Sequence, residues 1–224
     1  MSHSVHPYAH RLGIIRDWQS RWFARSGSGE YQKWLRADVL LREWLSKRLR
    51  GNFVKAIEIE RGATHMRVIV KTSRPGMVIG RNGENSQKLR QDIVHFWQQR
   101  KIDPPQELKL DIEEVKNPES HAQIAGQMIV EGLERRFPFK RAARQVIEKV
   151  MANKNVQGVK VTLSGRLGGA EMSRSESFKK GNLPLQTLRA DLDFAKETAY
   201  LPYGVIGVKV WIYRGEVFGK ETKS

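Results

Sequence analysis

The feature that most limits how this chain can fold is a glycine-rich turn from Gly76 to Glu84. Before the turn, Met66, Val68 and Val70 alternate with polar residues, which is the period of a half-buried strand. After the turn, apolar residues recur at three- and four-residue steps and predict an amphipathic helix: Leu89, Ile93, Phe96 and Trp97. The turn therefore joins a strand to a helix.

Within this turn, Gly80-Arg81-Asn82-Gly83 forms a Gly-x-x-Gly motif around a basic residue. Two glycines permit a tight turn that brings the backbone close to a phosphodiester, and the amides of the following helix N-terminus face the phosphate. This chemistry is typical of KH domains, which clamp an RNA backbone. An ordinary turn between helices remains the alternative, because the same spacing recurs at Gly204 to Gly207 in an apolar strand without a basic residue.

The composition points to a polyanionic partner. The 224 residues include 40 Lys and Arg against 24 Asp and Glu, a formal net charge of +16. So basic a chain repels itself when compact, and nucleic acid is the simplest partner that releases counterions on binding. No stretch resembles a membrane span or a signal peptide, so we expect a cytoplasmic protein without a membrane partner. The lack of cysteine excludes disulfides, zinc knuckles and thiol nucleophiles.

The hydrophobic pattern divides the chain into three parts. Residues 1–30 carry aromatic and basic side chains without a clear period, and we interpret them as a docking extension. Residues 31–116 predict a helix, a hairpin, a helix pair and a strand, and a polar break follows at Asn117. Residues 117–224 predict two helices and then a sheet of about four strands: Val159–Leu163, Met172–Phe178, Leu185–Leu192 and Val205–Tyr213. The fold class is therefore α+β.

Several segments resemble one protein family, that of bacterial small-subunit ribosomal protein three. The run from Arg74 to Glu84 is closely similar to the KH motif of that family. Further segments match it in order: Val5–Pro7, Arg11–Ile14, Leu133–Arg136, Phe139–Ala142, Ser164–Glu171, Pro184–Asp191 and Tyr203–Trp211. Together they span about residues 5 to 219, so the match is specific although each motif alone is weak.

The resemblance implies a type II KH domain over residues 31–116, followed by an α+β domain with two helices packed on a sheet. It implies a structural component of the small-subunit head that binds ribosomal RNA and neighbouring ribosomal proteins. It also implies that the protein lines the channel through which messenger RNA enters and assists its unwinding. Catalytic residues and cofactors do not belong to this picture, so we expect a cytoplasmic ribosomal protein that is not an enzyme.

The resemblance maps the messenger RNA contacts onto Lys140, Arg141 and Arg144. Their spacings of three and four residues place all three cations on one face of a helix, as such contacts require. A face of this kind grips phosphates without reading bases. Lys140 stands where the family usually has Arg, and Arg144 where it usually has Lys, so the charge is kept and only fine geometry differs. A solvated basic face without a special role is the alternative.

A second set of basic residues is predicted to contact ribosomal RNA. Ser164 to Glu171 is rich in glycine, but no Gly-Lys-Ser/Thr follows, so it is not a P-loop. We interpret it as a loop between strands in which Arg166 meets a phosphate, with a plain β-connection as the alternative. The remaining candidates lie in the N-terminal extension or extend the loop surface: Arg11, Arg16, Arg174, Lys179 and Lys180.

Two further sets of residues near the N-terminus are candidate functional sites. Trp18 and Trp22 are predicted to stack on bases or to pack on a partner protein. His3, His6 and His10 are spaced by three and four residues, but no carboxylate or cysteine set accompanies them. We therefore predict no metal site.

Two other functions remain open at the level of sequence. The chain is alternatively a free KH-domain regulator of RNA outside the ribosome, or an enzyme such as a nuclease or lyase. No Ser-His-Asp arrangement or paired carboxylate has a local signature, which argues against the enzyme. Length and motif coverage favour the ribosomal component over the free regulator.

Overall fold

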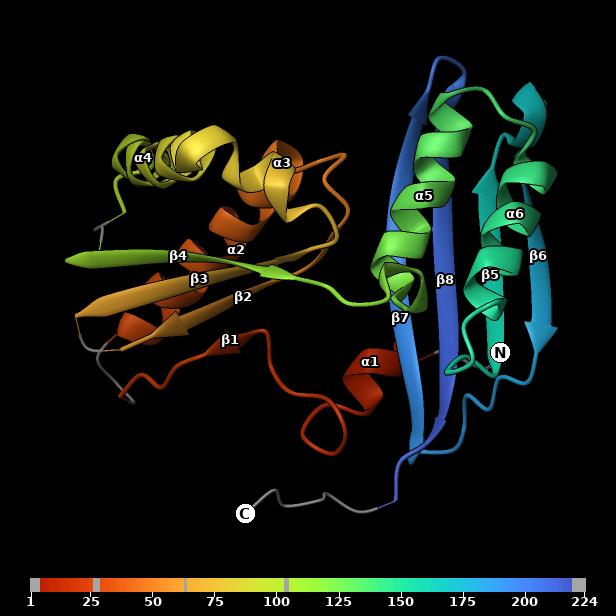
Figure 1. Ribbon diagram of the computed structural model, residues 1–224, viewed down its shortest axis with the longest axis horizontal. Coiled ribbons are helices and arrows are strands. Elements are labelled where there is room, and N and C mark those ends of the chain that lie inside the picture. The colour runs from red at the N-terminus through yellow and green to blue at the C-terminus, as the bar shows by residue number, and fades with distance from the viewer. Residues whose placement is uncertain (1–4, 26–28, 63, 103–104, 219–224) are drawn as a thin grey trace. The chain divides into compact units, whose positions relative to one another are not determined.

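The computed structural model describes residues 5–25, 29–62, 64–102 and 105–218. The chain forms two compact units, one of residues 18–116 and one that combines residues up to 17 with those from 117 onward. Each unit holds one four-stranded sheet with helices packed on it (Figure 1). The predicted α+β class and the four-stranded second sheet are therefore confirmed.

The first unit is built on the sheet β1-β2-β3-β4: Ser20–Arg21, Val54–Arg61, His65–Thr72 and Glu107–Glu114. β2 and β3 form the predicted antiparallel hairpin, whereas β1 runs parallel to β2 and β4 runs parallel to β3. Helices α2 (Glu30–Arg48) and α4 (Glu84–Gln99) share one core with the sheet, and Trp44 stacks on Phe96 between them. The short α3 (Pro75–Ile79) precedes the glycine turn.

The opposite face of this sheet is covered with paired charges. Lys71 Nζ lies 2.7 Å from a carboxylate oxygen of Glu58, and Arg67 pairs with Asp111 on the neighbouring strand. Arg21 of β1 adds a further pair to Glu58 at 3.2 Å. Cross-strand pairs of opposite charge stabilise a sheet, and here they neutralise its open face.

The second unit is built on the antiparallel sheet β6-β5-β8-β7: Arg174–Gly181, Gly158–Gly165, Gly204–Glu216 and Ala190–Leu201. Helices α5 (Ala122–Glu134) and α6 (Phe139–Met151) pack on one face, where alternate strand residues enter the core. The four-residue α1 (Pro7–His10) contacts β7 on the other face, and the His6 ring meets the Phe194 ring edge-on at 4.6 Å. Single 3₁₀ turns at Pro118–Ser120 and Leu167–Gly169 complete the unit.

Two strands of the second sheet differ from the sequence prediction. The predicted strand Leu185–Leu192 is wrong, because β7 begins only at Ala190. The residues before Ala190 form an irregular segment whose carbonyls accept hydrogen bonds from Arg11. The strand predicted at Met172–Phe178 lies a little later, at Arg174–Gly181. The second Gly-x-x-Gly motif opens β8 and buries Ile206, as the prediction of sheet packing required.

Candidate nucleic-acid interface

The predicted phosphate clamp is a sharp turn between α3 and α4. Gly80 has a φ of 75° and Gly83 a φ of 79°, and Asn82 between them also lies in the left-handed region at 53°. A Cβ on Gly80 would come within 2.7 Å of the Asn85 side chain, so both space and backbone favour glycine there. Asn tolerates the left-handed region better than most residues. The turn leaves Arg81 and Asn82 exposed at its tip.

The turn leads directly into the N-terminus of α4. Gly83 is the N-cap residue, and no side chain in the described part of the chain caps the first amides. The Glu84 amide donates to the Arg81 carbonyl, and the amides that follow it, together with the positive end of the helix dipole, favour an anion. With Arg81 beside them, these groups are suited to hold one phosphate through backbone contacts.

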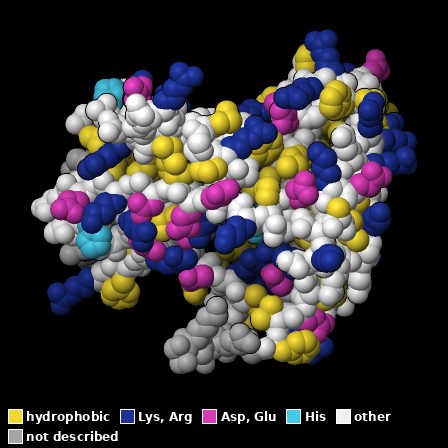
Figure 2. Space-filling view, viewed as in Figure 1, with side chains coloured by type: hydrophobic (Ala, Val, Ile, Leu, Met, Phe, Trp, Pro, Cys, Tyr) yellow, Lys and Arg dark blue, Asp and Glu magenta, His cyan; other side chains and the backbone are white. Residues whose placement is uncertain are grey.

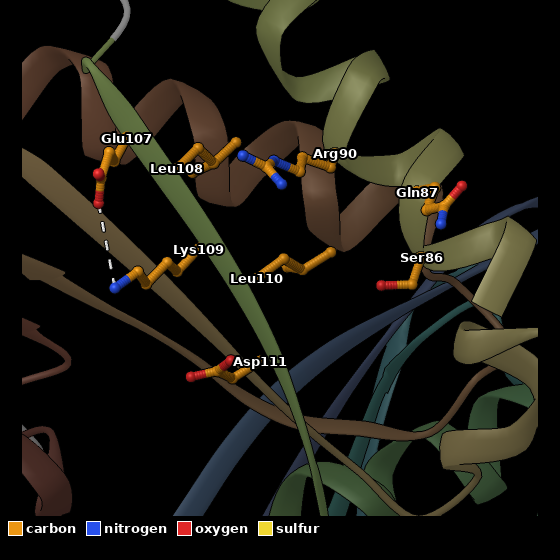
Figure 3. A pocket seen from close by; sticks show the side chains of 8 residues that line it. All are labelled: Ser86, Gln87, Arg90, Glu107, Leu108, Lys109, Leu110 and Asp111. Carbon is orange, nitrogen blue, oxygen red and sulfur yellow. Dashed lines mark ion pairs between the residues drawn. The ribbon is translucent and has the colours of Figure 1, made fainter.

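A surface groove of about 620 Å³ continues from this turn between α4 and β4 (Figure 3). Ser86, Gln87 and Arg90 project from α4, while Leu108 and Leu110 of β4 provide apolar surface. β4 is an edge strand, so its outer backbone groups remain open to a ligand. Sequence reasoning missed these groove residues, because the alternation of Leu108 and Leu110 predicts a strand but not its place at the edge.

The second candidate surface is the basic face of α6. Lys140, Arg141 and Arg144 are all exposed, whereas the other face of α6 is buried in the core: Ala142, Ala143, Val146, Ile147 and Val150. The predicted helix and the common exposure of its three cations therefore agree with the structure. Lys and Arg side chains gather over α6 and the neighbouring β6 in the space-filling view (Figure 2).

These cations occupy an unfavourable position for the helix itself. Lys140 and Arg141 lie in the first turn of α6, which has no acidic residue and no side-chain cap. The positive end of a helix dipole normally favours Asp or Glu there, so two cations cost the helix some stability. The same arrangement concentrates positive potential and attracts phosphate groups.

The structure brings Arg174 of β6 next to this face. The guanidinium carbon of Arg174 lies 5.8 Å from the centre of the Phe139 ring, and Lys140 Nζ lies 5.9 Å from the same ring. Lys179 and Lys180 are exposed further along β6, at the edge of the sheet. Arg174 and Lys180 lie on the α6 side of the edge strand and continue the basic face of that helix. Lys179 alternates with Lys180 and points to the opposite side of the sheet.

Comparison with known proteins decides the family. Residues 40–120 match the KH domain, and residues 129–212 match the C-terminal domain of ribosomal protein S3. Small ribosomal subunit protein uS3 of Bacillus anthracis is 42% identical over 224 residues, which are 100% of this chain and 97% of that protein. The chain belongs to the uS3 family.

Other uS3 proteins show the same similarity. The protein of Alcanivorax borkumensis is 42% identical over 219 residues, 98% of this chain and 91% of the relative. The protein of Solibacter usitatus is 43% identical over 217 residues, 97% of this chain but only 60% of that longer relative. Membership in the uS3 family makes the chain a component of the small ribosomal subunit, and thus a cytoplasmic protein, rather than an enzyme. It also implies binding of small-subunit ribosomal RNA.

The predicted RNA contact of Arg11 in this uS3-family chain is wrong, because its side chain is buried inside the protein, whereas a contact of the partly buried Arg16 remains a prediction. Arg11 is 0% exposed, and its guanidinium donates hydrogen bonds to four backbone carbonyls. Burial, and then the nearby Arg16, lower the pKa of Arg11 below its ordinary value, against the opposing effect of Asp191. Arg16 is partly buried and pairs with Asp191 at 2.5 Å. Both arginines tie the N-terminal residues to β7.

Arg166 has a mainly structural position as well. Its Nε donates to the carbonyl of Ala170 at 2.9 Å and its Nη1 to the carbonyl of Tyr203 at 3.0 Å. These bonds fix the Ser164–Glu171 loop, whose Gly168 has a φ of 72°. The loop lies between β5 and β6 as predicted, and a contact of Arg166 with phosphate remains a prediction.

Trp22 is not available for stacking on bases. Its Nε1 donates to Asp38 at 2.8 Å, and its ring packs against Tyr31 and Trp34 at centroid distances of 5.4 and 5.5 Å. Asp38 also accepts hydrogen bonds from Arg61 and is only 1% exposed. Trp18, in contrast, is 55% exposed. Stacking of Trp22 on bases, one of the two predicted roles, is therefore disfavoured, and a partner contact of Trp18 or Trp22 remains a prediction.

A buried charge network at the start of α5 was also missed. Asp193 of β7 accepts a hydrogen bond from the Ala122 amide at 3.0 Å and pairs with Arg214 at 2.7 Å. Burial opposes ionisation of Asp193, but His121 and the charges of Arg214 and Arg16 bring its pKa well below the usual range. The carboxylate thus caps α5 from the sheet.

The described residues hold no metal cluster and no membrane-spanning helix. Within the described ranges no three His, Asp or Glu side chains gather to hold a metal ion. His6 accepts a hydrogen bond from the Ala9 amide at 3.2 Å, and His3 lies outside the described residues. None of the helices that the structure describes is long and apolar enough to cross a membrane.

Proposed function

We propose that this uS3-family chain lines the channel through which messenger RNA enters the small subunit, and that α6 holds the messenger backbone during unwinding. The observation that carries this proposal is the exposure of Lys140, Arg141 and Arg144 on the first turns of one amphipathic helix. Such a face binds phosphates regardless of sequence, as a channel for every messenger requires. By holding separated strands it opposes reannealing as the ribosome advances, so the chain needs no nucleotide hydrolysis of its own.

The KH turn and its groove are proposed to bind ribosomal RNA. The amides of α4, Arg81 and the two glycines support a phosphate contact, and the groove between α4 and β4 supports a place for the adjoining nucleotide. No observation on the described residues favours a regulator outside the ribosome, so one function is proposed.

The α6 assignment is tested by replacing Lys140, Arg141 and Arg144 together with Ala. We expect translation through a stable messenger hairpin to slow by up to about tenfold, which is about 1.4 kcal/mol of barrier. Translation of an unstructured messenger and sedimentation of assembled subunits are expected to stay normal, because the three side chains project from the core rather than into it.

The matched control replaces three other exposed lysines with Ala: Lys116, Lys149 and Lys154. It removes the same net charge outside the first turns of α6 and is expected to leave hairpin passage unchanged. If the α6 variant passed hairpins at the rate of this control, the three residues would belong to the scaffold.

The KH turn is tested by the double variant Arg81→Asp, Asn82→Asp. It puts two carboxylates where the phosphate is proposed to lie, and we expect affinity for a short single-stranded RNA to fall at least about tenfold. The control Lys33→Asp, Gln98→Asp changes the net charge equally at exposed positions of the same unit. Equal losses in both variants, measured by fluorescence anisotropy, would remove the turn from the RNA-binding surface.

A further inference from the structure

The second sheet carries a lysine on each strand of the face that α5 and α6 leave uncovered. Val159, Val161 and Leu163 of β5 are buried in the core beneath the helices. Lys160 and Thr162 alternate with them and so point away from the helices. The strand register adds the other members of what we call the lysine face: Lys160, Lys179, Lys196 and Lys209 with Thr162, Ser164, Ser175, Ser177 and Thr198.

The charge of the lysine face is not compensated within the described chain. None of its four lysines forms an ion pair with a described carboxylate, and no Asp or Glu shares their outward positions in the ladder. The open face of the first sheet is different, since Lys71, Arg67 and Arg21 are each matched there by Glu or Asp. The chain neutralises one open sheet face and leaves the other positive.

The four lysines also stand in pairs that repel each other. Lys179 lies directly opposite Lys160, and Lys209 directly opposite Lys196. Like charges at directly opposed positions destabilise a sheet. Lys160 finds partial compensation over the Trp211 ring, with Nζ 5.4 Å from its centre. A polyanion bound across the face would relieve the repulsion.

The other side chains of the lysine face fit an RNA backbone better than a protein. The hydroxyls of Thr162 and Ser177 lie 2.8 Å apart in the row that ends in Lys209 and Lys196, and such hydroxyls commonly bond phosphate oxygens. The centre of a protein interface, by contrast, is depleted in Lys and Ser.

The two aromatic residues in the same row as Lys160 argue for paired rather than unpaired RNA, while Tyr200, nearer the end of β7 on the same face, is 62% exposed. Phe194 and Trp211 are half-buried and pack on each other with ring centres 5.1 Å apart. His6 covers the edge of Phe194, and Lys160 lies over Trp211. Rings engaged in this way do not form the open platform on which single-stranded bases stack.

We infer that the lysine face docks on the sugar–phosphate backbone of a double-helical segment of ribosomal RNA. Helical RNA is recognised mainly by its shape and its phosphates, which suits a rigid sheet with charges at fixed positions. The inference rests on uS3-family membership and on the face itself. It does not rest on the messenger RNA role of α6, which packs on the other side of the same sheet.

The test uses the full chain with Lys160→Gln, Lys179→Gln, Lys196→Gln and Lys209→Gln combined. The probe is an RNA duplex of about 20 base pairs, longer than the roughly 16 that a double-stranded-RNA domain spans. We expect duplex affinity to fall at least about tenfold, and the slope of log K against log salt to become shallower by roughly 3. The melting temperature is expected to stay the same or to rise, because opposed like charges are removed.

The matched control removes four exposed lysines elsewhere by substitution with Gln: Lys33, Lys47, Lys116 and Lys154. An equal loss of duplex affinity in this control would show that the loss comes from net charge and not from the position of the lysines, and it would overturn the inference. Unchanged duplex affinity in the lysine-face variant would overturn it as well and leave the face to a protein or to solvent. An equal loss on an unstructured single strand would overturn the assignment to a double helix. The α6 residues are intact in both variants, so none of these outcomes decides the messenger RNA proposal.

Discussion

Replacing Arg11 with Met is expected to lower the free energy of unfolding of the second unit by about 3–5 kcal/mol. Arg11 Nε donates to Ala190 at 2.8 Å, and Nη1 donates to Pro7 at 3.0 Å. Nη2 donates to Leu185 at 3.0 Å and to Thr187 at 2.8 Å. Met occupies a similar volume but donates no hydrogen bond, so the buried carbonyls lose their partner. Domains are commonly stable by only about 5–15 kcal/mol, so this loss is a large part of the total.

Hydrogen exchange resolved by segment measures the effect, since it separates the amides of β7 and β8 from those of the first unit. Arg189→Met is the control: the Arg189 side chain is 59% exposed and pairs with Glu216. Exposed pairs contribute about 0–1 kcal/mol, so protection of β7 is expected to change little. Similar protection in both variants would show that water replaces Arg11 at the carbonyls and that the N-terminal residues are not a structural part of the unit.

Much of the fold follows from periodicity, because each predicted helix has one face that must be buried. α4 places Leu89, Ile93 and Trp97 in the core at the predicted spacing. The same reasoning predicts that the cations of α6 share a face away from its apolar residues, and in the structure they are exposed. These elements are predictable because the decisive pattern lies within about ten consecutive residues.

The burial of Arg11 could not be predicted from the local sequence pattern. An arginine in a short irregular segment reads as surface charge, and its partners at Leu185 and Ala190 lie 174 and 179 residues away. The lysine face is hidden for the same reason. Lys160 and Lys209 are visible in the sequence, but only the strand order brings four lysines to one side.

The extension that was interpreted as a docking segment is therefore built into the chain at two points. Arg11 and Arg16 anchor residues 5–17 to the second unit. Residues from Trp18 onward belong to the first unit, where β1 adds a short parallel strand and Asp38 binds Ser20 and Trp22. Whether its exposed residues, such as Trp18, also dock on a partner remains a prediction.

Replacing Asp38 with Ala is expected to destabilise the first unit by about 3–5 kcal/mol. Asp38 Oδ1 accepts from Arg61 Nε at 2.9 Å and Nη2 at 2.6 Å, while Oδ2 accepts from Ser20 at 2.9 Å and Trp22 at 2.8 Å. Burial lowers the pKa of the neighbouring Arg42, and Asp38 opposes that shift. Without the carboxylate, two poorly solvated guanidinium groups lose their counter-charge. Urea unfolding followed by tryptophan fluorescence reports the loss directly, because Trp22 and Trp34 lie in this cluster.

Two further variants separate the charge of Asp38 from its hydrogen bonds and its burial. Asp38→Asn keeps an acceptor for Trp22 but removes the charge. Its free energy of unfolding is therefore expected to lie between those of the wild type and Asp38→Ala. Asp92→Ala breaks an exposed pair to Arg48 at 3.2 Å and is expected to change stability by about 1 kcal/mol at most. Release of the N-terminal strand should also speed tryptic cleavage after Arg21 in Asp38→Ala. If Asp38→Ala were as stable as Asp92→Ala and cleaved no faster, then β1 and Trp22 would be held by sheet pairing and ring packing alone.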